Sequence, residues 1–425
     1  MSDSNDPSTL DSDSYGAWLT IVGIQESGPE ELCEKARQAI SEAEVVFGGS
    51  RHLALTGTLI RGTPMAWASP FNEGIEQLLA MRGRRVCVLA SGDPFHYGVG
   101  ATLAEHVPAQ EMIVFPAPSA FSLACGRMGW PMQKSRLLSL HGRAMTRLNA
   151  HLHQGVRIVA LTSDGTAPRQ MANMLVERNM GHSIVTVLEA LGGPQERIVS
   201  FRAEALARET DDFHALNVVT LEIEQSGNSP VAGLAPGRVD ALFEHDGQIT
   251  RRDIRAMTLA RLSPRPGERL WDVGAGAGSI AIEWLLLDES LDALAIERDQ
   301  ARCERIRRNA DNLGTPRLEV ICGEAPSALD GLATPDAIFV GGSVSNMALL
   351  AKCFDALRPG GRLVANAVTL ESELALGECH RMLGGELSRT SFEQTAPLGS
   401  LTGWTPSRTI TQWVWTKPLD FAGTS

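Results

Sequence analysis

Short apolar runs alternate with helix-period stretches along most of the chain. A short apolar run bounded by turn residues is typical of a buried strand, and a 3.6-residue period is typical of an amphipathic helix. Strands that alternate with helices are joined by crossovers, which predicts an α/β fold with mostly parallel sheets. Strands are expected at Leu19–Val22, Val45–Phe47, Val86–Leu89, Ile113–Phe115, Ile158–Leu161, Ser183–Val187, Val218–Leu221, Leu270–Val273, Ala293–Ile296, Leu318–Ile321, Ala337–Val340, Arg362–Ala365 and Thr409–Trp415, and helices at Glu30–Glu44, Ser119–Met128 and Ala167–Asn179.

The alternation stops once, near Gln225, and restarts near Leu270. Much of the intervening segment is rich in Gly, Pro and Ser and has no hydrophobic period, so it predicts a linker. A chain of 425 residues is too long for one ordinary core and fits two α/β domains of about 200 residues each. The expected division is a disordered tail at 1–14, a first domain at 15–225, a linker at 226–238, a second domain at 239–417 and a tail at 418–425.

Composition restricts the partners of the protein. There are 38 Lys and Arg against 50 Asp and Glu, a net charge of -12, whereas non-specific binding to nucleic acid needs a basic surface. No run approaches the roughly 18 apolar residues of a membrane helix. The seven cysteines are scattered and include no Cys-x-x-Cys pair. We therefore expect no nucleic acid, no membrane, no disulfide, no bound metal and a reducing, cytoplasmic setting.

One glycine-rich turn is expected to bind a cofactor. The segment Trp271–Ser279 (WDVGAGAGS) closes an expected strand and opens an expected helix, and such turns let the backbone approach a nucleotide-like ligand. The next strand ends at Glu297, whose carboxylate could accept both ribose hydroxyls of an adenosine, and a third strand end adds an acidic residue. The expected contacts are Asp272, Gly274, Ala275, Gly276, Gly278, Ser279, Glu297, Gly323, Glu324 and Ala325.

Two other interpretations of this turn stay open. A tight turn without a ligand would use the same glycines. An NAD-dependent oxidoreductase would carry Gly-x-Gly-x-x-Gly/Ala, and counted from Gly274 the last of these positions is Ser279. S-adenosylmethionine (SAM) has no pyrophosphate and does not need the close helix packing that the last glycine allows, so we favour SAM.

In the first half, two turns follow expected strands. Ser91–Pro94 contains a glycine and a carboxylate, and Pro116–Ala120 contains a candidate helix N-cap. Each turn taken alone is better explained as loop and cap chemistry, but two strand-end turns in succession would form a crevice. The candidate ligand contacts in these turns are Gly92, Asp93, Ser119 and Ala120.

Three further segments of the second half carry a family pattern, namely Ile249–Arg255, Phe339–Ser343 and Pro359–Glu371. With the glycine turn they make residues 233–417 similar to the class I SAM-dependent methyltransferases, and more narrowly to the decarboxylating precorrin methyltransferases. The resemblance implies a Rossmann-like sheet, with substrate contacts at Arg255 and Asn366. For Arg255, a place on a solvated helix face is an equal alternative.

In the first half, the segments Gly48–Leu53 and Ser139–Arg143 join the two strand-end turns. Together they make residues 18–224 similar to the class III SAM methyltransferases, the tetrapyrrole methylase family. The resemblance implies two α/β lobes with SAM between them and a corrinoid precursor in the adjoining cleft, and it adds Gly23 and Tyr97 to the expected cofactor contacts. One departure is Gln25, which stands where the family has a second glycine and leaves the contacts of that loop open.

The order of the two modules resembles the bifunctional, decarboxylating corrinoid methyltransferases of cobalamin biosynthesis. The resemblance implies a homo-oligomeric enzyme that uses SAM to methylate carbons 5 and 15 of precorrin-6B and removes the ring C acetate carboxyl to give precorrin-8. The first half is expected to act on carbon 5 and the second on carbon 15. No catalytic acid or base is assigned, because positioning supplies most of the acceleration in methyl transfer. The alternatives are a methyltransferase on another substrate whose first module only scaffolds, and an NAD-dependent oxidoreductase.

Overall fold

The computed structural model describes residues 16–226 and 233–419, which form two compact units. The first unit takes in the chain up to Arg143 and the segment that begins at Gln154, and the stretch Ala144–His153 groups with the second unit. The expected tail at 1–14, half of the expected linker and most of the tail at 418–425 lie outside the described residues. The expected domain boundaries therefore stay a prediction.

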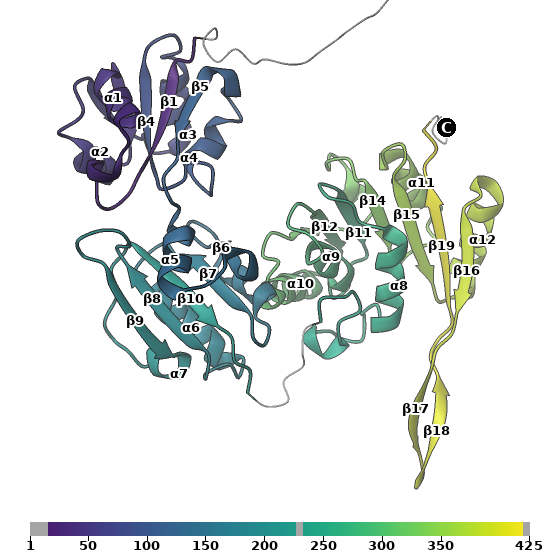
Figure 1. The fold of residues 1–425 in the computed structure, drawn as a ribbon. Coiled ribbons are helices and arrows are strands. Elements are labelled where there is room, and N and C mark those ends of the chain that lie inside the picture. Colours follow the sequence, from purple (N-terminus) through teal and green to yellow (C-terminus); the bar gives the residue numbers. More distant parts are fainter. Residues whose placement is uncertain (1–15, 227–232, 420–425) are drawn as a thin grey trace, which may run out of the picture. The chain divides into compact units, whose positions relative to one another are not determined.

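The first sheet of the first unit is parallel throughout, in the order β3-β2-β4-β1-β5. Alternate residues of the central strands face two separate cores, so that Ile21 and Val88 pack on one face while Val22 and Leu89 pack on the other. Helices cover both faces (Figure 1), as a buried parallel sheet requires. The elements are β1 (Leu19–Ile24), α1 (Glu34–Glu42), β2 (Val45–Gly48), α2 (Ser50–Thr56), β3 (Thr63–Ala66), α3 (Phe71–Leu79), β4 (Val86–Ser91), α4 (Val99–Leu103) and β5 (Met112–Phe115).

The second sheet of the first unit, in the order β6-β7-β10-β8-β9, departs from the expected parallel pairing. Only β6 and β7 run parallel, whereas β10 is antiparallel to β7 and β8, and β8 is antiparallel to β9. The connection between β8 and β9 is too short for a crossover helix, so these strands form a hairpin. The elements are α5 (Ala120–Met128), β6 (Arg136–Ser139), β7 (Arg157–Leu161), α6 (Ala167–Glu177), β8 (Ile184–Glu189), β9 (Arg197–Arg202), α7 (Ala203–Leu206) and β10 (Asn217–Glu222).

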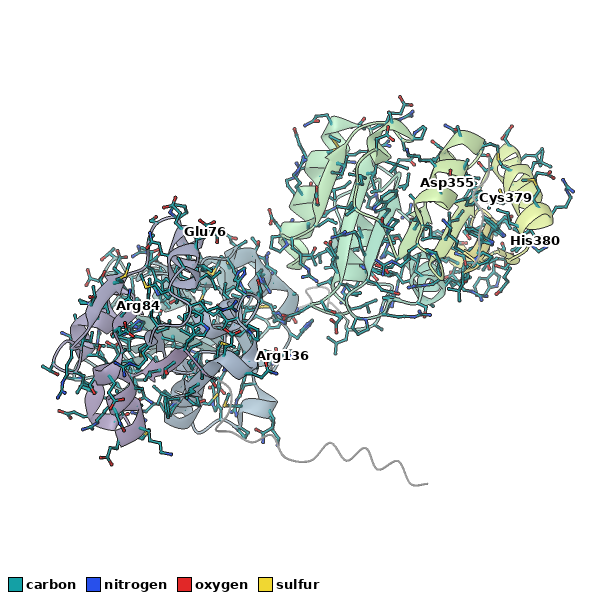
Figure 2. The ribbon with its side chains drawn as sticks, turned by 90° about the horizontal axis from the view of Figure 1, so that it is seen from above. Glu76, Arg84, Arg136, Asp355, Cys379 and His380 are labelled. Carbon is teal, nitrogen blue, oxygen red and sulfur yellow. A yellow bond between two sulfur atoms is a disulfide. The ribbon has the colours of Figure 1, made fainter. Side chains whose placement is uncertain are left out.

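The second unit is built on one sheet in the order β13-β12-β11-β14-β15-β19-β16. The strands from β13 to β15 are parallel, and β19 is antiparallel to both of its neighbours. Cys379, labelled in Figure 2, is one of the fully buried side chains that join α12 to the core on one face of this sheet. The elements are α8 (Arg252–Leu262), β11 (Arg269–Val273), α9 (Ser279–Leu285), β12 (Asp292–Glu297), α10 (Gln300–Leu313), β13 (Glu319–Cys322), β14 (Ala337–Val340), α11 (Met347–Ala356), β15 (Arg362–Ala367), α12 (Leu370–Leu383), β16 (Glu386–Thr390) and β19 (Ile410–Thr416).

Strands β17 (Glu393–Leu398) and β18 (Leu401–Pro406) pair only with each other and form a ribbon that projects from the second unit (Figure 1). The apolar side chains Leu398, Leu401 and Trp404 on this ribbon are each about 70% exposed. Every strand expected from the sequence is present, whereas the strands of this ribbon were not expected. Among the described helices, none is long and apolar enough to cross a lipid bilayer.

Candidate functional site

The glycine turn of the second unit lies between β11 and α9, at the carboxyl end of β11. Gly274, Gly276 and Gly278 all have positive φ, at 75°, 59° and 74°. Only glycine adopts this backbone without strain, so the sequence GAGAG dictates the shape of the turn. The amide of Gly274 donates to the carbonyl of Ile296 at 2.9 Å, which holds the turn against the end of β12.

Two of these glycines are also required by packing within the protein. A Cβ on Gly276 would lie 2.8 Å from the carbonyl oxygen of Gln248, and one on Gly278 would lie 2.7 Å from Cγ2 of Ile306. Gly278 therefore allows α10 to approach the turn. These distances assign both glycines a role in closing the turn onto its neighbours, in addition to any contact with a ligand.

Glu297, at the end of β12, is buried and turned toward the glycine turn. Its Oε2 accepts from the amide of Gly276 at 2.9 Å, and its Oε1 accepts from the amide of Asp299 at 3.1 Å. Each carboxylate oxygen has a second lone pair that these bonds leave available. The carboxylate is thus held in one orientation and can still accept hydrogen bonds from a ligand diol.

Asp272 lies within β11 and is almost completely buried. Its Oδ2 accepts from the amide of Ala281 at 3.0 Å, while its buried Oδ1 has no hydrogen-bond partner among the described residues. Burial, with a smaller contribution from the charge of Glu297, raises the pKa of Asp272 to about 7. A buried carboxylate oxygen without a donor is suited to a ligand that brings a donor or a positive charge.

The third strand end contributes the loop Gly323–Ala325 after β13. The amide of Gly323 donates to the carbonyl of Glu297 at 2.9 Å, so this loop lies beside the end of β12. Glu324 is exposed, with its carboxylate 3.7 Å from Arg298. The three expected strand ends are therefore neighbours at one edge of the sheet.

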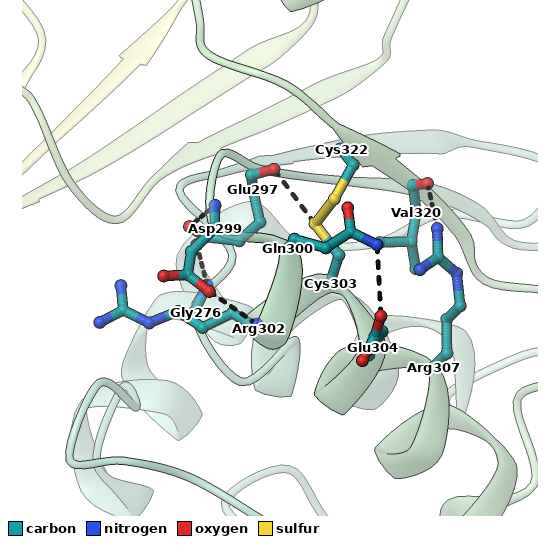
Figure 3. The surroundings of a disulfide bond; sticks show 10 residues. All are labelled: Gly276, Glu297, Asp299, Gln300, Arg302, Cys303, Glu304, Arg307, Val320 and Cys322. Atoms are coloured by element: carbon teal, nitrogen blue, oxygen red, sulfur yellow. Dashed lines mark hydrogen bonds between the residues drawn. A yellow bond between two sulfur atoms is a disulfide. The ribbon is translucent and has the colours of Figure 1, made fainter.

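A disulfide joins Cys303 on α10 to Cys322 at the end of β13, beside Glu297 (Figure 3). The expectation of no disulfide is wrong for this pair. The two cysteines are 19 positions apart in the sequence, but the crossover returns the chain so that their Cα atoms are 6.1 Å apart. Spacing alone does not show this proximity, because it arises from the packing of α10 against the sheet.

Asn366, an expected substrate contact, lies near the end of β15 and is half-buried. Its Nδ2 donates to Oγ1 of Thr258 at 3.1 Å, and its Oδ1 accepts from Nε2 of Gln412 at 2.8 Å. One N–H and one lone pair of the amide remain available for a ligand. The substrate role of Asn366 stays a prediction.

Arg255, the other expected substrate contact, is fully buried. Its guanidinium donates to Glu283 at 2.7 Å, to Asp240 at 3.1 Å and to two backbone carbonyls, and it stacks on the ring of Phe243 at 4.7 Å. The structure therefore gives Arg255 a structural role in place of the expected substrate contact. The full burial of Arg255 rules out both the exposed helix face and a direct substrate contact. The sequence alone could not show this, because the carboxylates that pair with Arg255 come from segments that only the fold brings together.

The first unit contains a cleft of about 720 Å³ between its two lobes. Within the first lobe, the ends of β1 and β4 approach closely, because a Cβ on Gly23 would lie only 1.9 Å from the carbonyl oxygen of Gly92. Ser119 caps α5 by accepting from the amide of Ser122 at 3.2 Å, which confirms the expected N-cap. Strand-end turns from β4 and β5 thus form part of the wall of the cleft.

Some of the expected cofactor contacts of the first unit line the cleft and others do not. Gly92, Tyr97, Ser119 and Ala120 line the cleft. Gly23 and Asp93 are not among the lining residues, and Oδ1 of Asp93 accepts from the amide of Phe95 at 2.9 Å within its own loop. The departing residue Gln25 does line the cleft, as do several polar residues without a sequence-based role: Glu26, Arg51, His52, His96, His141, Arg143 and Asn217.

The tryptophans near the carboxyl end show that local sequence does not decide burial. Trp413 and Trp415 lie in the core beside Phe354. Trp404, only nine positions before Trp413, is exposed on the β17–β18 ribbon. The ribbon has no partner sheet among the described residues, so its apolar side chains have nothing to pack against.

Two family models match separate parts of the chain. Tetrapyrrole (corrin/porphyrin) methylases match residues 19–207, and the precorrin methyltransferase domain matches residues 241–417. The two matches fall on the two modules expected from the sequence.

Curated proteins match almost the whole chain. A precorrin-6Y C(5,15)-methyltransferase [decarboxylating] from Sinorhizobium sp is 48% identical over 94% of this chain and 96% of its own length. The protein of the same name from Mycobacterium tuberculosis is 40% identical over 94% of this chain and 100% of its own length. Among solved structures, the C-terminal domain of precorrin-6Y C5,15-methyltransferase from Rhodobacter capsulatus is 45% identical, covers 44% of this chain and 100% of that chain, and has a TM-score of 0.42.

Proposed function

The chain belongs to the family of decarboxylating precorrin-6Y C(5,15)-methyltransferases, and from this premise we propose that it is a bifunctional SAM-dependent enzyme of cobalamin biosynthesis. It methylates carbons 5 and 15 of precorrin-6B and removes the ring C acetate carboxyl, giving precorrin-8. The observation that carries the proposal is the presence of two separate ligand-type sites in one chain. The first lies mostly within residues 19–207 and the second within residues 241–417, the parts that match the two methyltransferase families.

In the second unit, Glu297 and Asp272 are the residues that would hold SAM. Glu297 offers two oriented carboxylate oxygens that suit the ribose hydroxyls. The orphaned Oδ1 of Asp272 suits the positively charged amino acid end of SAM. SAM, when bound, supplies an electrophilic sulfonium methyl group, and the protein orients it toward a ring carbon of the substrate.

In the first unit, the cleft between the lobes would hold a second SAM with the tetrapyrrole beside it. Its wall combines apolar side chains such as Leu188 and Leu191 with the polar ends of Ser119 and Asn217. An adenosine has an apolar face and a polar edge, so this mixture suits it. Two sites of different architecture would each fit one edge of an asymmetric ring, and we assign carbon 5 to the first unit and carbon 15 with decarboxylation to the second.

We further propose that the protein is a cytoplasmic homo-oligomer. The support for self-association is the β17–β18 ribbon, because an isolated two-stranded ribbon is marginally stable in water and this one carries exposed leucine and tryptophan. A second copy of the chain would cover these side chains. The support for the cytoplasm is the family's biosynthetic chemistry.

The test of the proposed function is incubation of the full chain with SAM and precorrin-6B, with the product mass measured. The expected product has gained two methyl groups and lost carbon dioxide. At limiting SAM, replacement of Glu297 by Gln should slow both the second unit's methylation and its decarboxylation. If the wild-type chain transfers no methyl group to precorrin-6B, or if the Glu297→Gln protein still decarboxylates at the normal rate, the corresponding part of the proposal is wrong.

A further inference from the structure

A cluster of four polar side chains lies in the wall of the first-unit cleft. Arg51 on α2 forms an ion pair with Glu26, which follows β1, and its Nη2 donates to Oγ of Ser91 at 3.1 Å. The imidazole of His52 contacts Arg51 and Ser91, with Nε2 3.0 Å from Nη2 of Arg51 and 2.9 Å from Oγ of Ser91. All four residues line the cleft.

The donor and acceptor of each hydrogen bond in this cluster can be assigned from the chemistry of the groups. A guanidinium can only donate, so Nε2 of His52 acts as the acceptor and the imidazole is neutral. Burial and the charge of Arg51 agree with this, since they lower the pKa of His52 to about 4. The hydroxyl of Ser91 accepts from Arg51 and can donate to His52. The cluster therefore holds the guanidinium in place without adding a second positive charge.

Arg51 still has capacity to bind a ligand. Its side chain is 39% exposed, and the bonds to Glu26, Ser91 and His52 use three of its five N–H donors. A planar guanidinium fixed by such bonds holds its two remaining N–H donors, on Nε and Nη1, in set directions for an anionic ligand.

The rest of the cleft also favours an anionic ligand. Arg143, in the segment after β6, lies 5.3 Å from the ring of Tyr97 and lines the same cleft. Among the described residues that line the cleft, Glu26 is the one carboxylate, and it is already paired with Arg51. A positively biased cleft in a chain of net charge -12 is a local feature that the overall composition does not explain.

We propose that Arg51 is a specificity-determining residue of the first unit and that its guanidinium binds a peripheral carboxylate of the tetrapyrrole substrate. Glu26 is then a positioning residue that orients the guanidinium of Arg51. The inference rests on the proposed function and adds the residues that select the substrate. In the sheet order β3-β2-β4-β1-β5, Arg51 follows β2, on the other side of β4 from β1 and β5. The cofactor-type residues Ser119 and Ala120 follow β5, so Arg51 is displaced from them toward the opposite edge.

The experiment measures steady-state methylation by the full chain, with precorrin-6B and methyl-labelled SAM varied separately and the carbon-5 methyl identified by carbon NMR. Arg51→Ala should raise the half-saturating precorrin concentration at least about tenfold, as loss of a charged hydrogen bond predicts. The maximal rate should stay within about threefold, and the half-saturating SAM concentration should not change. Arg51→Lys keeps the charge but loses the planar, fixed donors and should give an intermediate increase. Arg84→Ala is the matched control, because Arg84 (labelled in Figure 2) is an exposed arginine paired with Glu44 near the opposite end of β4.

Variants of Glu26 test whether this residue orients Arg51 or only stabilises the fold. Glu26→Ala releases Arg51 and should raise the half-saturating precorrin concentration, whereas Glu26→Gln keeps an acceptor and should restore a value close to that of the wild type. An unchanged precorrin dependence in Arg51→Ala overturns the proposal. So does an equal change in the SAM dependence, which would assign Arg51 to the cofactor. If Arg51→Ala does not fold, an unchanged precorrin dependence in Arg51→Lys is decisive. Failure of the wild-type chain to methylate carbon 5 would instead refute the proposed function.

Discussion

The backbone amide of Gly276 donates a hydrogen bond to Oε2 of Glu297 at 2.9 Å, which joins the glycine turn to the end of the neighbouring strand. The turn and the carboxylate therefore form one structural unit before any ligand binds. A ligand that meets this carboxylate finds it already oriented, so little free energy is spent on ordering it.

Replacing Glu297 with Gln should weaken SAM binding by the second unit about tenfold to hundredfold, because a hydrogen bond to a charged group contributes about 1.5–3 kcal/mol. Calorimetric titration of the full chain with SAM would measure this, with the first unit providing an internal reference. Glu319→Gln is a suitable control, since Glu319 is exposed at the beginning of β13. Equal SAM affinity in the wild type and the Glu297 variant would contradict the assignment.

The buried Asp272 should make the free energy of unfolding depend on pH. Its pKa is raised to about 7 in the folded protein, from an ordinary value of 3.8. The folded state therefore binds the proton more tightly, so the stabilisation is fully present below pH 3.8 and is lost as the pH rises through 7. Denaturant unfolding should show a loss on the order of 4 kcal/mol at most between the two limits. Asp272→Asn should remove this dependence, and an unchanged pH profile in that variant would refute it.

Gly276→Ala should destabilise the second unit even without a ligand. The new Cβ would lie 2.8 Å from the carbonyl oxygen of Gln248, and the backbone has a positive φ. The matched control is Gly331→Ala, which shares the positive φ but has open space around the new Cβ. Thermal or denaturant unfolding should show a cost for Gly276→Ala that exceeds the control by at least about 1 kcal/mol. Equal costs would show that the approach of Gln248 does not constrain the turn.

The disulfide between Cys303 and Cys322 should stabilise the second unit. Closing a loop of this length restricts the unfolded chain and typically contributes about 2–4 kcal/mol. Unfolding of the wild-type protein should therefore shift to lower denaturant when a thiol reductant is added. The double variant Cys303→Ser, Cys322→Ser should show no such shift, and a reductant-insensitive wild type would argue that the pair is reduced in solution.

Serine at Leu398 and Leu401 should lower the oligomeric state. Both side chains are at least 70% exposed at the end of the β17–β18 ribbon, where a second copy of the chain would bury them. Sedimentation of the full chain measures the outcome. Leu370→Ser is the control, since Leu370 is equally exposed on α12. If the wild type is a monomer, or if the serine variant associates as strongly as the wild type, the ribbon is not the interface.

The elements of the fold and the glycine turn were predictable because their causes are local. The apolar runs of β11 and β12 predict strands whatever position these strands take in the sheet. The glycines between Gly274 and Gly278 permit few conformations other than the observed turn. The position of Glu297 beside the turn also followed, because the carboxyl ends of neighbouring parallel strands meet at one edge.

What could not be predicted depends on contacts between distant segments. Arg255 was expected at a substrate because it lies in the segment Ile249–Arg255 that carries the family resemblance. Its partner Glu283 lies 28 positions away, and only the packing of α9 against α8 brings the two together. The same holds for the disulfide, which depends on how α10 packs on β13. The antiparallel pairing around β10 was not predicted. An apolar run identifies a strand but does not show whether a crossover or a hairpin follows it, and so does not give the direction of the neighbouring strand.

The buried pair of Arg255 and Glu283 has a consequence for where the second module can begin. The carboxylate of Glu283 also accepts from the amides of Gly237 and Arg238, at 2.6 and 3.0 Å. A shortened protein that starts at the expected boundary of 239 would keep the buried Glu283 and lose two of its donors, and an under-satisfied buried charge costs several kcal/mol. Gly237 and Arg238, which precede the matched precorrin methyltransferase domain at 241–417, thus belong to the structural core of the module, and any transfer of this module into another chain should include them.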